Sequence, residues 1–232
     1  MGTVPVSIII PTLNEAGGIA AVLARLQRFR PDAQIIVADG GSEDATADLA
    51  RPLADRVLDA PRGRARQMNA GAAAASGDVL LFLHADTVLP EDAPNAIRTA
   101  LERSDRHWGR FDATIAGRDA MLAVVSLMMN ARSRMSGIAT GDQAMFVRRE
   151  AFERAGGFPD IPLMEDVALS KRLKRVSRPL CLTARVIVSG RRFDERGAAR
   201  MILLMWRLRL EYWLGVPPAA LARRYGYAPR EG

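Results

Sequence analysis

Three short polar segments each follow an apolar run of the chain. Residues 11–15 read Pro-Thr-Leu-Asn-Glu, residues 39–42 read Asp-Gly-Gly-Ser, and residues 84–86 read His-Ala-Asp. Carboxylate, hydroxyl and imidazole groups can bind a divalent cation or the polar groups of a nucleotide. Mg²⁺ or Mn²⁺ needs few protein ligands when a diphosphate supplies the others, so one aspartate can suffice. The alternative is that these aspartates cap helices or close turns.

The spacing within two of these segments favours ligand binding. His84 and Asp86 follow the most apolar run, residues 79–83. Alternate residues of a strand face the same way, so both side chains are expected on one side. Asp39 precedes two glycines, which let a ligand approach the backbone while the carboxylate accepts hydrogen bonds from a base or ribose. A dinucleotide-binding loop would need G-x-G-x-x-G after the first strand, and residues 11–18 lack it.

Two pairs of arginines occur where an anion would be favourable. Arg64 and Arg66 fall in the first turn of an expected helix, where positive charge is unfavourable unless an anion lies nearby. A diphosphate would be such an anion, and two exposed arginines are the alternative. Arg191 and Arg192 follow an apolar run and could either clamp a phosphate or lie in a solvated turn.

Glu165 and Asp166 stand at the start of another expected helix. The helix N-terminus stabilises carboxylates in their ionised form, which a general base needs near neutral pH. Acidic residues are also common in this position for structural reasons alone. The pair is therefore a candidate catalytic group whose assignment depends on the other motifs.

Alternating apolar runs and segments with helical spacing predict an α/β fold. Strands are expected over residues 6–10, 35–38, 57–58, 79–83, 111–115, 144–147 and 186–188, and helices over 19–26, 45–50, 64–75, 91–103, 119–133, 168–176 and 198–214, with a further C-terminal helix beyond. Continuous apolar strands between helices indicate a sheet covered on both faces, and ligands bind beyond the carboxyl ends of its strands. The three polar segments should therefore meet on one rim.

Length and composition indicate a single globular domain over residues 1–232. Hydrophobic residues make up 49% of the chain, enough for a substantial core. The lone Cys181 cannot form an internal disulfide, and residues 1–5 lack the pattern of a secretory signal. The longest apolar stretches are well short of the roughly 20 residues that cross a bilayer. These features predict a cytoplasmic protein.

The net charge of +7 favours anionic partners. Nucleic acid, anionic lipid headgroups and the phosphates of a small substrate would each suit such a surplus, and genomic base composition is a fourth explanation. The sequence has no helix-turn-helix, zinc-finger or aromatic RNA-binding pattern, so no nucleic-acid partner is expected. Peripheral membrane contact stays open, because Trp206 and Trp213 lie beside arginines in an expected C-terminal helix.

Taken in order, these motifs resemble glycosyltransferase family 2. The family's P-T-x-N-E segment matches residues 11–15, and its nucleotide-binding carboxylate matches Asp39. The family's Arg/Asn-rich helix start matches residues 63–69, and its D-x-D motif matches residues 84–86. Its E-D motif matches Glu165 and Asp166. His84 replaces the first aspartate of D-x-D, which leaves its role as a ligand open. More narrowly, the chain is similar to a bacterial subgroup associated with arsenosugar biosynthesis, on residues 141–143, 146–149, 156–159, 163–166 and 189–192.

The resemblance implies a GT-A fold, with a mixed, mostly parallel sheet flanked by helices. It implies an inverting single displacement from a nucleotide-diphosphate sugar to a small-molecule acceptor. The nucleotide sugar would be held by Pro11, Thr12, Glu15, Asp39, Gly63, Arg66, Asn69, Ala85 and Arg192; Mn²⁺ or Mg²⁺ by Asp86, with His84 as an open second candidate; and the acceptor by Asp142, Gln143 and Trp108. Asp166 would be the catalytic base, with Glu165 beside it. The nucleotide-binding half would span about residues 1–90, the acceptor half about 91–195 and C-terminal helices about 196–232.

Two other functions would use some of the same features. A sugar-phosphate nucleotidyltransferase would share the sheet and the metal, but it usually carries a glycine-rich phosphate loop near its start. In residues 11–18 the glycines come late. The second alternative is a non-catalytic module that binds membrane surfaces through its basic C-terminal helix.

Overall fold

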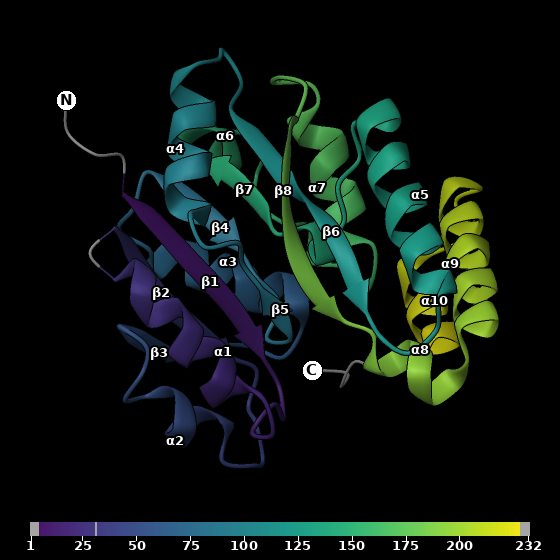
Figure 1. Ribbon diagram of the computed structural model, residues 1–232, viewed down its shortest axis with the longest axis horizontal. Helices are drawn as coiled ribbons and strands as arrows, with labels where there is room; N and C mark the ends of the chain where they lie inside the picture. Colours follow the sequence, from purple (N-terminus) through teal and green to yellow (C-terminus); the bar gives the residue numbers. More distant parts are fainter. Residues whose placement is uncertain (1–4, 31, 228–232) are drawn as a thin grey trace.

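The computed structural model describes residues 5–30 and 32–227, which form one eight-stranded sheet flanked by helices (Figure 1). The strands are β1 (Val6–Thr12), β2 (Ala33–Asp39), β3 (Arg56–Asp59), β4 (Val79–Phe82), β5 (Thr87–Val88), β6 (Trp108–Ala116), β7 (Met145–Arg148) and β8 (Leu180–Ser189). The predictions made for residues 1–4, for Pro31 and for residues 228–232 lie outside the described residues.

The sheet is mixed, with four parallel strands gathered at one side. In the order β3-β2-β1-β4-β7-β6-β8-β5, the first four strands are parallel, β7 is antiparallel to both neighbours, and β8 is parallel to β6. Parallel neighbours end at the same edge, so the carboxyl ends of β1, β2 and β4 share one rim. The predicted α/β class with a mixed, mostly parallel sheet is confirmed.

Helices cover both faces of this sheet (Figure 1). They are α1 (Ile19–Leu26), α2 (Thr46–Ala50), α3 (Arg64–Ala74), α4 (Ala93–Glu102), α5 (Met121–Ser136), α6 (Arg149–Arg154), α7 (Glu165–Leu173), α8 (Arg191–Arg196), α9 (Ala198–Trp213) and α10 (Pro218–Tyr225), with 3₁₀ turns at Gln27–Phe29 and Gly141–Gln143. In β1, Ile8 and Ile10 pack in a core with α1 and α4, whereas Ile9 packs with α3, α6 and α7. This alternation is typical of a strand buried on both faces.

Helix α5 covers the part of β6 that β7 does not reach. β7 pairs only with residues 108–110 of β6. Further along, the amide and carbonyl of Ala113 each bond to the side chain of Asn130 at 2.9 Å, and the amide of Ile115 donates to Ser126 Oγ at 2.9 Å. These side chains satisfy buried backbone groups that would otherwise lack partners. They also fix the position of α5 beside the rim.

The chain leaves the strand conformation earlier after β4 than its apolar run suggests. β4 ends at Phe82, and a turn covers residues 85–86. Strand alternation therefore does not apply to His84 and Asp86, and the prediction that both face one side for that reason is wrong. The two side chains instead reach different neighbours, as described below.

Two other boundaries differ from the sequence pattern. Helix α7 begins at Glu165 rather than near Ala168, which places both acidic residues in its first turn. Strand β8 begins at Leu180 rather than Val186, because its first half also pairs with β6 across a register shift. Hydrogen bonding to a neighbouring strand can extend a strand over residues that the hydrophobic periodicity of the sequence does not identify.

Candidate active site

The carboxyl ends of β1 and β2 are joined by a buried hydrogen-bond network. Thr12 Oγ1 donates to Asp39 Oδ1 at 3.0 Å, and the Ser42 hydroxyl donates to the same oxygen at 2.6 Å. Asp39 Oδ2 accepts the amides of Gly41 at 3.1 Å and Ser42 at 2.7 Å. Asp39 is only 3% exposed, and a carboxylate has about four acceptor sites. The expectation that Asp39 accepts a hydrogen bond from a base or ribose does not fit this arrangement, because the donors of the loop already occupy the carboxylate.

Gln67 of α3 fastens the helix to the same rim. Its Nε2 donates to the carbonyl oxygens of Thr12 at 2.6 Å and Ala38 at 2.9 Å. A Cβ on Gly40 would lie 2.9 Å from the Gln67 side chain, so this close approach requires glycine. A Cβ on Gly41 would meet no atom within 4 Å. The loop therefore leaves open backbone surface above the ends of β1 and β2.

Glu15 and Asp86 lie near enough to interact electrostatically, beside two arginines of α8. Burial and then the charge of Asp86 raise the pKa of Glu15, while Arg191 and Arg192 lower it. The amide of Ser189 donates to the backbone oxygen of Asp86 at 3.3 Å, which joins the loop after β4 to the end of β8. Two carboxylates and two guanidinium groups from three distant segments thus share one part of the rim.

The donor set at Asp86 fits a hard cation whose coordination is completed by substrate oxygens. Asp86 is exposed, and its carboxylate accepts a long contact of 3.4 Å from the hydroxyl of Thr87, so lone pairs remain for a metal. Within residues 5–30 and 32–227, no group of three or more His, Cys, Asp or Glu side chains could hold a metal by itself. Mg²⁺ bound by one or two carboxylates and a diphosphate needs no such group. Glu15 is the neighbouring carboxylate.

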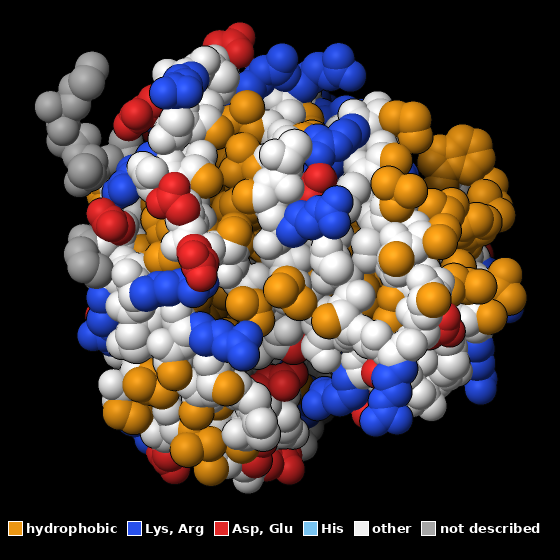
Figure 2. Space-filling model, viewed as in Figure 1, with side chains coloured by type: hydrophobic (Ala, Val, Ile, Leu, Met, Phe, Trp, Pro, Cys, Tyr) orange, Lys and Arg blue, Asp and Glu red, His pale blue; other side chains and the backbone are white. Residues whose placement is uncertain are grey.

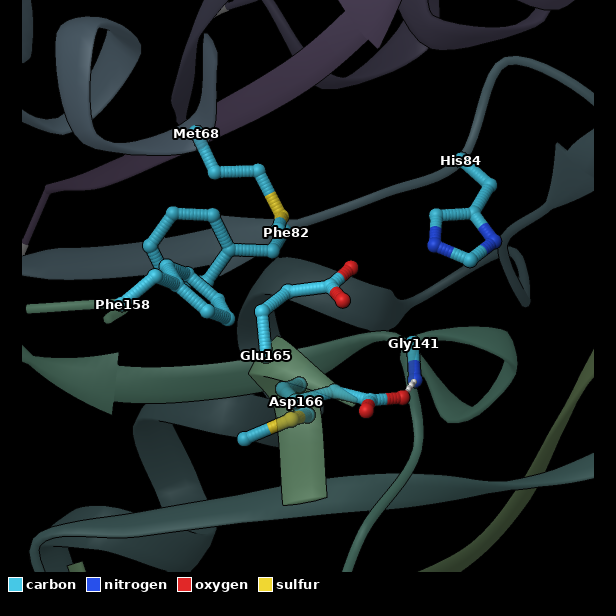
Figure 3. A pocket seen from close by; sticks show the side chains of 8 residues that line it. Met68, Phe82, His84, Gly141, Phe158, Glu165 and Asp166 are labelled. Atoms are coloured by element: carbon cyan, nitrogen blue, oxygen red, sulfur yellow. Dashed lines mark hydrogen bonds between the residues drawn. The ribbon is translucent and has the colours of Figure 1, made fainter. Parts of the chain in front are cut away.

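Backbone amides hold the carboxylate of Asp166 in a fixed orientation at the start of α7, and Figure 3 shows the one from Gly141. The amide of Gly141 donates to Oδ2 at 2.8 Å, and the amide of Val167 donates to Oδ1 at 2.7 Å. Each oxygen keeps a lone pair for a further donor. Asp166 is half-buried, so a substrate can reach it.

Glu165 lies beside Asp166 and is almost completely buried. It is 3% exposed, and its Oε1 lies 3.7 Å from Nη1 of Arg64, which comes from the first turn of α3. Figure 3 shows its carboxylate pointing toward His84. The cavity between these side chains has a volume of ≈ 10 Å³, about the space that one water molecule needs.

His84 is held within this acidic group. Its Nδ1 lies 3.3 Å from Oδ1 of Asp142, and its Nε2 is buried without a hydrogen-bond partner in the described chain. A Cβ on Gly141 would lie 2.4 Å from Nε2, so the ring fits here because residue 141 is glycine. The prediction of His84 as a metal ligand beside Asp86 does not fit, because the imidazole is directed to Asp142 and Glu165 instead.

The charges in this group shift two carboxyl pKa values in opposite directions. Burial and then the charge of Asp166 raise the pKa of Glu165 to about 7, against the lowering effect of Arg64. Desolvation also raises the pKa of Asp142, but the hydrogen bond and charge of His84, together with the charges of Arg64 and Arg209, outweigh it and bring that pKa down to about 2. At neutral pH Glu165 therefore holds a proton for part of the time, whereas Asp142 is ionised.

Glu165→Gln is expected to flatten the pH dependence of stability. The pKa of Glu165 is raised in the folded chain from 4.5 to about 7, so the folded state binds this proton more tightly than the unfolded chain. The stability gained is complete below pH 4.5 and is lost as the pH rises through about 7. A tenfold difference in proton affinity corresponds to about 1.4 kcal/mol. Between pH 5 and 8 the free energy of unfolding of the original chain should therefore fall by at least about 1 kcal/mol more than that of the variant.

Urea unfolding at both pH values measures this difference. The matched control is Glu150→Gln, which removes an 84% exposed carboxylate from the first turn of α6. The control should follow the original chain. Equal pH dependence in Glu165→Gln and the original chain would contradict the assignment.

Two residues predicted to contact the acceptor are parts of the core. Trp108 is fully buried, and its Nε1 donates to the carbonyl oxygen of Ser177 at 2.8 Å. Gln143 is also fully buried, and its side chain bonds the amide of Thr140 and Oδ1 of Asn130. Neither side chain has surface left for an acceptor, so we correct both assignments.

Two residues of α3 predicted at the nucleotide sugar are engaged elsewhere. Nε of Arg66 lies 2.9 Å from both carboxylate oxygens of Asp160. The Asn69 side chain bonds both the carbonyl, at 2.8 Å, and the amide, at 3.0 Å, of Phe158. These contacts fasten α3 to the loop before α7. It is Arg64, not Arg66, that reaches the acidic group.

The remaining predicted residues lie along the rim. Pro11 is in β1, Gly63 is the N-cap of α3 with φ of 135°, and Ala85 is in the turn between His84 and Asp86. Arg192 stacks on the ring of Tyr225, with its guanidinium carbon 5.6 Å from the ring centroid, and donates to the Tyr225 hydroxyl.

Sequence reasoning missed three residues near Asp166 or Asp142. Arg132 of α5 and Tyr212 of α9 each lie close enough for the charge of Asp166 to affect their pKa. Arg209 of α9 affects both Arg132 and Asp142. None of the three belongs to a motif. The one signal in the sequence was the position of Arg132, a charged residue that follows the apolar first part of the expected helix at 119–133.

Comparisons with known proteins agree with this architecture. The family model for glycosyl transferase family 2 matches residues 7–154, more than half of the chain. A PGL/p-HBAD biosynthesis glycosyltransferase of Mycobacterium tuberculosis is 41% identical over 93 residues, 37% of this chain and 36% of the relative. The succinoglycan biosynthesis protein ExoA of Rhizobium meliloti is 28% identical over 197 residues, 76% of this chain and 60% of the relative. The chain thus spans about a third of the first relative's length and three-fifths of the second's.

A solved structure extends the likeness to nearly the whole chain. The mannosyltransferase PcManGT of Pyrobaculum calidifontis, in complex with GDP-Man and Mn²⁺, superimposes with a TM-score of 0.65 and 25% identity, over 97% of this chain and 65% of that one. With the match of the family model, this likeness shows that the chain has a GT-A fold and belongs to glycosyl transferase family 2.

Proposed function

We propose that this chain transfers a sugar from a nucleotide-diphosphate sugar to a hydroxyl group of a small-molecule acceptor, by a single displacement with inversion. The observation that carries the proposal is the presence of two charged groups on one rim. Glu15 and Asp86 lie beside the arginines of α8, and Asp166 lies beside Glu165. The first group suits a diphosphate with its cation, and the second suits activation of a hydroxyl. Residues 84–86 connect them.

The nucleoside is assigned to the open surface above β1 and β2. Pro11 and Thr12 form the end of β1, and Asp39 holds the loop whose Gly41 backbone faces that surface. Gly63, the N-cap of α3, and Ala85, in the turn after β4, are assigned to the same donor. The similar mannosyltransferase is described with GDP-Man and Mn²⁺, which supports a donor of this class.

Asp86, with Glu15 beside it, would hold Mn²⁺ or Mg²⁺ at the diphosphate. A bound divalent cation neutralises charge that develops on the leaving group. Arg191 and Arg192 add fixed positive charge on the same part of the rim, and guanidinium groups match phosphate oxygens geometrically. These four side chains would orient the donor with its anomeric carbon toward α7.

Asp166 would take the proton of the acceptor hydroxyl as that oxygen bonds to the anomeric carbon. The bond from this carbon to the diphosphate oxygen breaks, and its electron pair leaves with the nucleoside diphosphate. Because the hydroxyl attacks from the face opposite the leaving group, the configuration inverts. The amides of Gly141 and Val167 keep Asp166 aimed at the hydroxyl. Protonation of Glu165, favoured by its raised pKa, reduces repulsion between the two carboxyl groups.

The donor class can be tested with purified chain and a panel of nucleotide sugars. Calorimetry should detect binding of a UDP- or GDP-linked sugar with Mn²⁺ and much weaker binding with a chelator. Candidate acceptors should include arsenosugar precursors, because the motif resemblance points to that subgroup, and NMR of the product would establish its anomeric configuration. Release of pyrophosphate from a nucleoside triphosphate and a sugar phosphate, without turnover of any nucleotide sugar, would contradict the proposal in favour of a nucleotidyltransferase.

We also propose that the chain contacts anionic membrane surfaces through one apolar face. This α5/α9 patch consists of Met121, Val124, Leu127, Met128 and Met135 on α5, of Leu203, Trp206, Leu210 and Trp213 on α9, and of Leu214, the C-cap of α9, each between 47% and 78% exposed. Figure 2 shows hydrophobic side chains gathered at this side of the molecule. No described helix is both long enough and apolar enough to span a bilayer.

The charges around the patch favour an anionic surface. α5 contains no acidic residue, and Glu211, the acidic residue of α9, pairs with Arg207 and Arg224. Arg200 of α9 is exposed and, among the described residues, forms no ion pair, whereas the exposed Arg134 of α5 pairs with Asp112. Tryptophan and leucine flanked by arginine are typical of a helix that lies in the interface of an anionic membrane.

Trp206→Glu with Trp213→Glu should lower affinity for vesicles containing phosphatidylglycerol by about tenfold or more, because both rings leave the interface and two negative charges enter it. Co-sedimentation measures this. Leu49→Glu, at a 39% exposed position of α2, is the control and should bind normally. Unchanged binding of the double variant, or self-association through the patch without vesicle binding, would contradict the proposal.

A further inference from the structure

Two guanidinium groups, Arg132 near Asp166 and Arg209 near Asp142, form no ion pair among the described residues. Nε and Nη2 of Arg132 are buried without any hydrogen bond in the described chain. Arg209 lies near it on α9 and, among the described residues, is likewise in no ion pair or hydrogen bond. The buried Arg110 shows the contrast, because it bonds to Asp112, to Ser133 Oγ and to the backbone oxygen of Asn130.

Holding these two cations together costs free energy. Burial and then the charge of Arg209 lower the pKa of Arg132 to about 10, and the charge of Asp166 offsets only part of that. A buried donor without a partner costs about 1–3 kcal/mol. Unfavourable polar groups that persist in a fold are concentrated at ligand sites, where the ligand supplies what is missing. Here the missing group is an anion.

The surroundings place this anion on the acceptor side. Arg132 interacts with Asp166, and Arg209 interacts with Asp142, on the α7 side of the rim. The arginines of α8 interact with Glu15 at the part of the rim assigned to the diphosphate. Tyr212 of α9 lies near Asp166 as well and offers a neutral donor.

We propose that Arg132 and Arg209 form a subsite for a phosphate or carboxylate group of the acceptor, which positions the acceptor hydroxyl at Asp166. The inference rests on the proposed function, because it assumes that a hydroxyl is activated there. Guanidinium groups bind phosphate and carboxylate through paired, charge-assisted hydrogen bonds. The enzyme should therefore select acceptors that carry a negative charge close to the reacting hydroxyl over neutral analogues.

The test uses the chain with its donor site filled by a nucleoside diphosphate and Mg²⁺, so that added anions report on the second subsite. Inorganic phosphate and acetate are titrated by calorimetry as probes of the two anion types. At least one probe should bind, and Arg132→Gln or Arg209→Gln should weaken it by about tenfold or more. Arg200→Gln removes an exposed arginine from the same helix as Arg209 and should change binding by less than about twofold.

Thermal unfolding without the probes separates binding from structure. Because Arg132 is a partly buried cation with unsatisfied donors, Arg132→Gln should melt at the same temperature as the original chain or higher. Three results would each overturn the inference. The first is that neither probe binds, and the second is that both variants bind the probes as the original chain does. The third is a marked fall in the melting temperature of Arg132→Gln. If the nucleoside diphosphate itself does not bind, it is the proposed function that fails.

Discussion

Asp166→Asn is expected to lower kcat by about 10²–10⁴-fold, the range of a lost general base. The asparagine oxygen can still accept one of the two backbone amides that hold the carboxylate, from Gly141 and Val167. The local fold should therefore persist, but a carboxamide cannot take a proton from the acceptor hydroxyl. Because Asp166 acts on the acceptor, the Kd of the nucleotide sugar should change by less than about twofold.

The comparison requires a variant with the same chemical change at another helix start. Asp119→Asn provides it, since Asp119 is exposed and its Oδ1 accepts the amide of Met121 at the start of α5 at 2.8 Å. Single-turnover rates and donor calorimetry on both variants are decisive. A large loss of donor affinity in Asp166→Asn, or transfer at the original rate, would show that the residue does not act as the base.

Asp86→Asn is expected to lower kcat/KM by about 10³-fold, because a Lewis acid at the leaving group contributes several kcal/mol. The amide is a poorer ligand than the carboxylate that lies exposed beside Glu15. Donor binding should become weak at Mn²⁺ concentrations that saturate the original chain. Excess Mn²⁺ should restore part of the activity.

Titration of Mn²⁺ at fixed donor concentration measures this effect. Asp92→Asn, an exposed carboxylate that bonds to Asn95 at the start of α4, is the control and should keep the original metal dependence. If Asp86→Asn retains the original dependence on Mn²⁺, the metal is held elsewhere.

The sheet could be predicted from the sequence because its signals are local. Apolar runs such as residues 79–83 and helical spacing such as Ile19, Leu23 and Leu26 reflect burial of one face or both. The alternation of strands and helices along the chain predicted the parallel pairing of β1 to β4. The pairing of residues 180–185 with β6 could not be predicted from the sequence. These residues are mostly half-exposed, and they form a strand because they pair with β6.

The candidate site could be predicted at the level of motifs but not of contacts. Residue types at strand ends indicated which loops gather, whereas the tertiary fold decides which atoms are already bonded. Asn69 and Gln143 illustrate this, because their amides satisfy backbone groups of loops distant in sequence or of a 3₁₀ turn. For the same reason spacing could not distinguish Arg64 from Arg66.

Residues outside any motif were beyond the reach of sequence reasoning. Arg132 and Arg209 come from helices whose patterns gave no sign of an acceptor site, and their proximity depends on how α5 packs on β6 and how α9 packs on α5. The position of α5 is fixed by buried polar contacts such as those of Asn130 with Ala113, which periodicity does not reveal.

The central claim is that one metal-bound diphosphate lies on the rim between Asp86 and Asp166. The chain offers a direct test, because it has two histidines. His84 stands beside Asp86 just after the carboxyl end of β4. His107 precedes β6, and its carbonyl oxygen accepts the amide of Arg148, which pairs with Val79 at the start of β4, so the two histidines are roughly 17 Å apart along the strands. Paramagnetic Mn²⁺ broadens nearby proton signals steeply with distance.

In proton NMR spectra, Mn²⁺ added with a nucleoside diphosphate should broaden the imidazole signals of His84 beyond detection and broaden those of His107 far less. Mg²⁺ in place of Mn²⁺ should broaden neither. Equal broadening of both histidines, or a sharp His84 signal when the nucleotide is saturating, would contradict a metal-bound diphosphate at this rim.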